Sequence, residues 1–70
     1  MIQFSLEGEE FIPLCDLLKV TSICESGGQA KALISSELVF VDGEIETRKR
    51  CKIRAGQKVT FEDQTVLITK

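Results

Sequence analysis

The apolar residues of this chain follow two different periods, and this change of period restricts the folds that the chain can adopt. Leu14, Leu17 and Leu18 recur at the i, i+3, i+4 spacing of a helix with one apolar face. In the second half, apolar residues such as Val59 and Phe61 alternate with polar ones, as in a strand with one buried face. A chain of 70 residues buries only a modest core. The pattern therefore predicts an α+β fold, with two short helices packed on a small, mostly antiparallel sheet.

Residue preferences at helix ends set the limits of the two helices. Pro13 suits the first position of a helix, where its missing amide hydrogen would have no partner, and a first helix is predicted from Pro13 to Val20. Ser26-Gly27-Gly28-Gln29 has the spacing of a capping box, in which the Ser hydroxyl accepts from the third helical amide and Gln29 reaches back. A second helix is predicted from there until Ser35-Ser36-Glu37 ends it.

Turn residues divide the remaining segments into strands. Ile2, Phe4 and Leu6 alternate with polar residues and predict a first strand. Asp42-Gly43 between two apolar segments predicts a tight hairpin, because this pair tolerates the positive φ angles of a primed turn. Ala55-Gly56 and Asp63-Gln64 predict two later turns. No linker composition interrupts this order, so we expect a single domain over residues 1–70.

The positive charges gather in one segment although the formal net charge is −2. Residues 47–61 contain no acid, and their cations are Arg48, Lys49, Arg50, Lys52, Arg54 and Lys58. Like charges this close repel one another, so the segment favours binding to a polyanion, and phosphate is the obvious one. The alternative is a solvated strand or loop whose charges pair with Glu44, Glu46 and Glu62.

Three motifs resemble the RNA-binding domain named after ribosomal small-subunit protein S-four. They are Ser26-Gly27-Gly28-Gln29-Ala30-Lys31 with Leu33-Ile34, Val39-x-Val41-Asp42-Gly43, and Ala55-Gly56-Gln57-x-Val59. The first motif together with residues 46–53 is similar to the single-domain bacterial branch of that family, the YbcJ-like proteins. The resemblance covers about Leu14 to Phe61. It implies that the two helices and the hairpin, the αL motif of the family, bind structured RNA, usually ribosomal or transfer RNA, in association with ribosomes.

The resemblance also assigns roles to individual residues. It implies that Ser26, Gly28 and Gln29 position the second helix on RNA. It implies phosphate contacts for a set of cations, which are Lys31, Arg48, Lys49, Arg50, Lys52 and Arg54. The helix start around Gly27 and Gly28 offers unpaired amides to an anion, whereas the alternative is that these glycines only permit tight packing.

The chain departs from the family pattern at three places. Pro13-Leu14-Cys15 stands where many members have Arg-Leu-Asp, and Gly27 stands where many have Arg. Both departures remove RNA contacts, so the specificity of other members cannot be transferred to this chain. Glu37 stands where a helix-ending Gly is usual, and the two alternatives are strain at that corner or simple accommodation of the side chain.

Other chemistries find little support in the sequence. Cys15, Cys24 and Cys51 form no Cys-x-x-Cys pair, and the chain has no histidine to complete a zinc site or act as a base. We therefore expect no metal, no cofactor and no enzymatic activity. The odd number of cysteines and the lack of a leader segment or a membrane-spanning apolar run favour a cytoplasmic protein without a membrane partner.

Two alternatives concern the partner and the mode of binding. We expect the protein to be a monomer. A protein-interaction adaptor whose basic face binds an acidic protein would need the same cluster of charges. A sulfur carrier of the β-grasp type would need a C-terminal Gly-Gly, but the chain ends Ile68-Thr69-Lys70, which excludes it.

The four phenylalanines, which are Phe4, Phe11, Phe40 and Phe61, stand in apolar contexts and are expected in the core. That placement favours recognition of folded RNA through its backbone and shape over base stacking.

Overall fold

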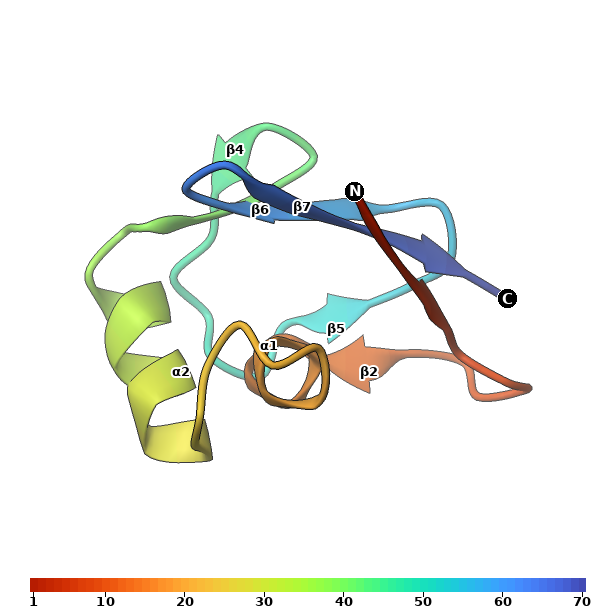
Figure 1. Cartoon of the computed structure of the whole chain (residues 1–70), viewed down its shortest axis with the longest axis horizontal. Coiled ribbons are helices and arrows are strands. Elements are labelled where there is room, and N and C mark those ends of the chain that lie inside the picture. The colour runs from red at the N-terminus through yellow and green to blue at the C-terminus, as the bar shows by residue number, and fades with distance from the viewer.

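The computed structural model describes all 70 residues, Met1–Lys70, as two sheets and two helices (Figure 1). In chain order the elements are β1 (Ile2–Ser5), β2 (Ile12–Pro13), α1 (Leu14–Val20), α2 (Gly27–Ser35), β3 (Val39–Val41), β4 (Glu44–Ile45), β5 (Lys52–Ile53), β6 (Lys58–Phe61) and β7 (Gln64–Thr69). The larger sheet forms one layer, and the helices with the β2/β5 pair form the other (Figure 1). This arrangement confirms the predicted α+β class. Neither helix is long or apolar enough to span a membrane.

The larger sheet has five strands in the order β1-β7-β6-β3-β4. All neighbours are antiparallel except β1 and β7, which run parallel with Ile2 opposite Val66. The predicted Asp42-Gly43 hairpin is confirmed, with φ angles of 52° and 87° at its two turn residues. The last turn lies one residue earlier than predicted. Gln64 pairs with Phe61, so the turn residues are Glu62 and Asp63.

A second, two-stranded sheet pairs β2 with β5, and the sequence analysis missed it. Ile12 lies opposite Ile53, and Pro13 lies opposite Lys52. The prediction that the basic run forms the strand after the hairpin is therefore only partly right, because Arg48 to Arg50 lie in a loop and the strand begins at Lys52. Three consecutive cations offer no apolar side chain to bury, whereas Ile53 is fully buried.

The start of α1 is held by main-chain partners. Pro13 is extended, with φ −60° and ψ 140°, and precedes the helix instead of forming its first turn as predicted. The amides of Leu14 and Cys15 donate to the carbonyls of Cys51 (2.9 Å) and Lys49 (3.0 Å). Pairing of Pro13 with Lys52 keeps Pro13 in the strand conformation, and the chain turns into the helix one residue later.

The start of α2 has the predicted capping arrangement with one difference. The hydroxyl of Ser26 accepts from the amide of Gln29 (3.1 Å). The Gln29 side chain reaches back one residue further than in a standard capping box and accepts from the amide of Glu25 (2.8 Å). Two amides near the helix start therefore have side-chain partners within the chain.

One core of 13 buried residues joins the two layers, and all of them are apolar. The helices contribute the three leucines of the predicted stripe together with Ala30 and Ile34, and Cys15 is only 2% exposed, as predicted. The β2/β5 pair adds Ile53. Burying a leucine or isoleucine side chain contributes on the order of 1.5–3 kcal/mol to the stability of the fold. Two helices this short are unstable in isolation, and the shared core stabilises them.

Of the two alternatives for the end of α2, the backbone angle of Glu37 favours strain. Glu37 has a φ of 64°, in the left-handed region that suits glycine. Its amide donates to the carbonyl of Ile34 (3.2 Å), and the amide of Leu38 donates to that of Leu33 (3.3 Å), which is the hydrogen-bond pattern of a Schellman cap. The cap thus forms with a residue whose side chain disfavours it.

Replacing this residue should therefore stabilise the protein. We expect Glu37→Gly to raise the free energy of unfolding by about 1 kcal/mol, because glycine adopts the left-handed conformation without the cost carried by other residues. The adjacent Ser36, with a φ of −84°, provides a matched control, and Ser36→Gly should lower stability. Urea denaturation of both variants measures the effect, and a loss of stability in Glu37→Gly would contradict it.

Candidate nucleic-acid interface

The basic segment, defined here as Arg48–Arg54, is anchored to the helix layer through its backbone. The carbonyls of Lys49 and Cys51 accept hydrogen bonds from the first two amides of α1. Within the segment, the amide of Cys51 donates to the carbonyl of Arg48 (3.1 Å). Lys52 and Ile53 then pair with β2. The main chain of the segment is thereby fixed, while its charged side chains point outward.

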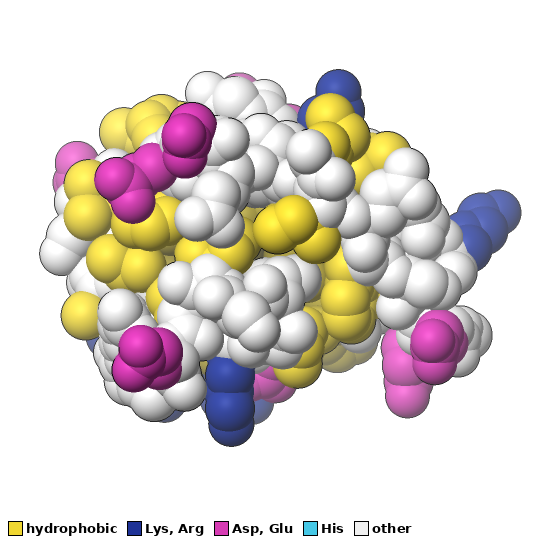
Figure 2. Space-filling model, in the orientation of Figure 1, with side chains coloured by type: hydrophobic (Ala, Val, Ile, Leu, Met, Phe, Trp, Pro, Cys, Tyr) yellow, Lys and Arg dark blue, Asp and Glu magenta, His cyan; other side chains and the backbone are white.

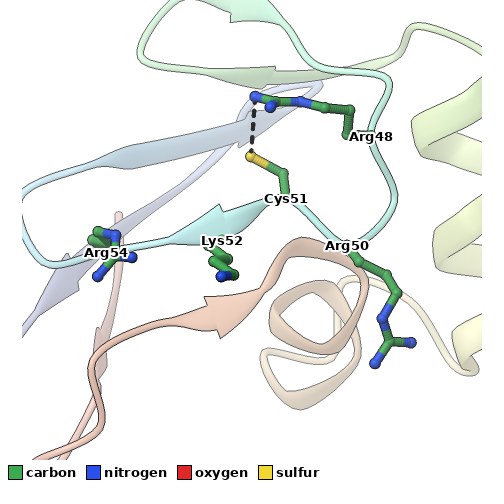
Figure 3. Close-up of a pocket in the computed structure, with 5 residues that line it drawn as sticks. All are labelled: Arg48, Arg50, Cys51, Lys52 and Arg54. Atoms are coloured by element: carbon green, nitrogen blue, oxygen red, sulfur yellow. Dashed lines mark hydrogen bonds between the residues drawn. The ribbon is translucent and has the colours of Figure 1, made fainter.

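These side chains surround an open hollow of about 530 Å³ on the protein surface. Its lining consists of Arg48, Arg50, Cys51, Lys52 and Arg54, and we call it the basic hollow. Figure 3 shows Lys52 and Arg54 projecting from the same side of β5, while Arg50 extends away from them past α1. No acidic residue lines the hollow, so its electrostatic potential is positive and favours an anionic ligand.

The face of the molecule that Figure 2 shows differs in character from the basic segment. Figure 2, in the orientation of Figure 1, shows apolar side chains between the sheet and the helix layer, with Lys and Arg side chains only at the margins. In Figure 1 the helix α2 lies at the left of the picture, and in Figure 3 it lies at the right. Figure 3 therefore shows the basic segment from a different direction than Figures 1 and 2. Few cations therefore lie on the face that Figure 2 shows.

Most cations of the basic segment have no acidic partner. The structure contains two ion pairs, Arg48 with Glu46 at 2.9 Å and Arg54 with Glu10 at 4.0 Å. Lys49, Arg50 and Lys52 are therefore unpaired. Of the three glutamates that could have neutralised the segment, only Glu46 does so, and it neutralises a single cation. The alternative of a solvated strand or loop paired with Glu44, Glu46 and Glu62 therefore holds for the Glu46 pair and the exposed loop, but not for Glu44 and Glu62.

Arg48 is the exception, because its guanidinium is already engaged. Nε donates to Oε2 of Glu46 (2.9 Å), Nη2 donates to Oε1 (3.0 Å), and the Arg48 amide also donates to Oε2 (2.9 Å). These hydrogen bonds lower the pKa of Glu46 from its ordinary value of 4.5 to about 2 and raise the pKa of Arg48. A phosphate that binds Arg48 must compete with this bidentate carboxylate.

Cys51 lies inside the basic hollow without being a reactive thiol. Nη2 of Arg48 lies 3.6 Å from its sulfur, as the dashed line in Figure 3 marks. Partial burial and the charge of Glu46 raise the pKa of the thiol, so it stays protonated at neutral pH. All three cysteines are free thiols, and no three His, Cys, Asp or Glu side chains lie together in a metal-binding arrangement.

The residues predicted on α2 lie apart from the lining of the basic hollow. None of Ser26, Gly28, Gln29 and Lys31 contributes to it, and neither does Lys49. Ser26 and Gln29 use their side-chain oxygens for capping, whereas Lys31 is exposed and unpaired. Tight packing does not explain the two glycines, because a Cβ at Gly27 would meet nothing within 4 Å and one at Gly28 only the Ser26 hydroxyl at 3.9 Å.

The sequence analysis missed an aromatic residue beside the basic hollow. Phe4 and Phe61 pack against the core as predicted, but Phe11 and Phe40 do not, so the prediction is wrong for these two. The cations of Lys52 and Arg54 lie 5.1 and 5.7 Å from the centre of the Phe11 ring. A two-residue strand gives too short an alternation to reveal this placement from sequence.

The Glu46–Arg48 contact predicts a pH dependence with a definite sign. The folded pKa of Glu46 lies below the unfolded one, so the pair stabilises the fold fully above about pH 4.5 and loses that contribution as the pH falls toward 2. Carboxyl chemical shifts followed by NMR should show a midpoint near pH 2 in the wild type. Arg48→Ala should move the midpoint back up toward the ordinary value, and Lys49→Ala should not. Equal midpoints in wild type and Arg48→Ala would contradict the contact.

Comparison with known proteins agrees with the motifs. The model of the S4 domain, the S-four type that the motifs resemble, matches residues 4–69. The chain is 52% identical over 68 residues, 97% of each chain, to YbcJ of Escherichia coli (strain K12), whose name gives RNA binding as its candidate activity. It is equally similar to an uncharacterized YbcJ from Shigella flexneri.

A solved structure supports the same relationship. The solution structure of YbcJ from Escherichia coli, described as revealing an αL motif involved in RNA binding, matches with a TM-score of 0.78 at 50% identity. The match covers 100% of this chain and 89% of the other. Sequence, motifs and three-dimensional structure agree, and the chain therefore belongs to the S4 domain family.

Proposed function

We propose that this protein binds structured RNA, without catalysing a reaction, through a basic face formed by the basic segment and the start of α2. One observation carries the proposal. The basic hollow is lined by four cations and no acid, and Arg50 and Lys52 in it lack any acidic partner. Unpaired cations held on a fixed backbone favour a polyanion. Membership of the S4 family, and the RNA-binding role that the names of its relatives give, favour RNA among the polyanions.

The cations are expected to contribute unequally. Four cations can bind phosphate without losing an ion pair, and only Lys52 among them would give up a weak contact with the Phe11 ring; they are Lys31, Lys49, Arg50 and Lys52. Arg54 gives up a long, exposed pair with Glu10 and a weak contact with the Phe11 ring, and such exposed contacts contribute little. Arg48 must exchange the carboxylate of Glu46 for a phosphate, so its net contribution is the smallest of the set.

Ser26, Gly28 and Gln29 have a positioning role in this proposal. Ser26 and Gln29 stabilise the start of α2, and the absence of a side chain at Gly28 leaves space beside it. We propose ribosomal or transfer RNA as the ligand, association with ribosomes, and a monomeric, single-domain protein acting in the cytoplasm. An acidic protein partner is the rival outcome, since carboxylates also bind unpaired cations.

The salt dependence of binding separates phosphate contacts from other contributions. We expect Arg50→Ala and Lys31→Ala each to reduce the steepness of log affinity against log salt by about 0.7–0.9. A variant that contacts one phosphate fewer releases fewer counterions from the RNA when it binds. Gln29→Ala should weaken binding without changing the slope. Fluorescence anisotropy with one hairpin RNA over a series of salt concentrations measures these values.

An acidic protein and two hairpins of equal shape but different sequence serve as controls. The two hairpins should bind alike, because phosphate contacts carry no sequence information. Binding of the acidic protein without detectable RNA binding at low salt would replace RNA with a protein partner. Wild-type slopes in both cation variants would place the RNA on another surface.

A further inference from the structure

The β2/β5 pair has two different faces. Ile12 and Ile53 lie opposite each other and point toward the core, where Ile53 is fully buried and Ile12 packs against it. Because side chains alternate along a strand, their neighbours Pro13 and Lys52 point to the other face, as do Phe11 and Arg54 beyond the pair. This outer face therefore combines an aromatic ring with two cations.

Weak contacts hold the two cations at the ring. Nζ of Lys52 and Cζ of Arg54 lie within 6 Å of the ring centre, at 5.1 and 5.7 Å. Cation–π contacts at exposed sites are weak, and the Arg54–Glu10 pair at 4.0 Å is exposed as well. A charge-assisted hydrogen bond to phosphate is stronger than either contact. Both side chains can therefore turn to a phosphate and uncover the ring.

Phe11 also lies at the border of two hollows of different character. On one side Lys52 and Arg54 line the basic hollow. On the other side Phe11 lines an open hollow of about 190 Å³, together with Phe4, Leu6, Glu9, Ile12 and Pro13, that is mostly apolar. An aromatic ring between phosphate-binding cations and an apolar surface is the arrangement that holds a base by stacking and its phosphate by charge.

We infer that Phe11 is a base-stacking position, and that the RNA recognised by this protein presents an unpaired nucleotide there. Its base stacks on the Phe11 ring, and the flanking phosphates bind Lys52 and Arg54. A base inside a duplex is already stacked on both sides, so only an unpaired nucleotide next to a helix can use this site. The inference rests on the proposed function and adds that the structured RNA must contain one unpaired nucleotide at the binding site.

A pair of RNAs with equal charge tests the inference. Both are the same hairpin with an abasic loop and a two-nucleotide extension at each end, but in one RNA the extension is abasic as well, so that the two RNAs have the same phosphates and differ only in the unpaired bases of the extension. The wild-type protein should bind the abasic RNA about 5-fold or more weakly, the loss expected for a single stacked base. Equal affinities for the two RNAs would overturn the inference.

Protein variants assign the preference to Phe11. Phe11→Leu keeps apolar bulk but lacks an aromatic face, and it should bind the two RNAs equally. Phe40→Leu, a change at the other phenylalanine that does not pack against the core, should keep the wild-type preference. A preference that survives in Phe11→Leu overturns the role of this residue. The comparison of the two RNAs in wild type does not depend on how a variant folds.

The same experiment separates this inference from the proposed function. If the wild type binds both RNAs equally and with a steep salt dependence, RNA binding stands and base stacking fails. If the wild type binds neither RNA at low salt, both the proposed function and the inference are overturned. Upfield shifts of the Phe11 ring protons on adding the hairpin with bases, and not the abasic one, would show the stack directly.

Discussion

Two main-chain hydrogen bonds, from the amides of Leu14 and Cys15 to the carbonyls of Cys51 and Lys49, connect the start of α1 to the basic segment. The helix has no side-chain cap, so these carbonyls satisfy amides that would otherwise lack partners. The same contacts continue the β2/β5 pairing, which buries Ile53 in the core between the two layers. Core packing, helix capping and the position of the cations therefore depend on one junction. Because the backbone supplies the anchor, the charged side chains remain available for a ligand.

The charge distribution explains how a chain with a net charge of −2 can offer a surface to RNA. Fields between exposed charges are screened over about 8–10 Å at ordinary ionic strength, so a local cluster matters more than the total. Acidic residues gather elsewhere, for example Glu37 and Glu62 beside Phe40 in an open hollow of about 380 Å³. Glu46 binds the guanidinium of Arg48 and Glu10 forms a long pair with Arg54, while the other cations of the basic segment have no acidic partner.

Much of the fold could be predicted because its signals are local. The leucine stripe of α1, the capping residues of α2 and the Asp42-Gly43 hairpin each lie within a few residues, and the structure confirms them. The β2/β5 pair could not be predicted, because it joins two residues near Ile12 to two near Ile53 and is too short for a period. Pro13 was misplaced for the same reason, since its conformation follows from pairing with Lys52.

The candidate site could be predicted in composition but not in geometry. A run of cations is visible in the sequence, and four of its members line one hollow. The unpaired state of Arg50, the bidentate contact of Arg48 and the aromatic neighbour of Lys52 are tertiary facts that spacing does not encode. The capping role of the side-chain oxygens of Ser26 and Gln29 was predicted from their spacing, whereas their role in RNA binding rests on the resemblance.

Amide chemical-shift mapping on addition of a hairpin RNA at low salt tests the basic face most directly. The account predicts that the largest changes fall on residues 48–54 and 26–31. The outer side of the larger sheet, around Phe40 and its cross-strand partner Ile45, should remain unchanged. Changes centred on that outer side, or a basic segment whose amide shifts stay the same while RNA binds, would contradict the account.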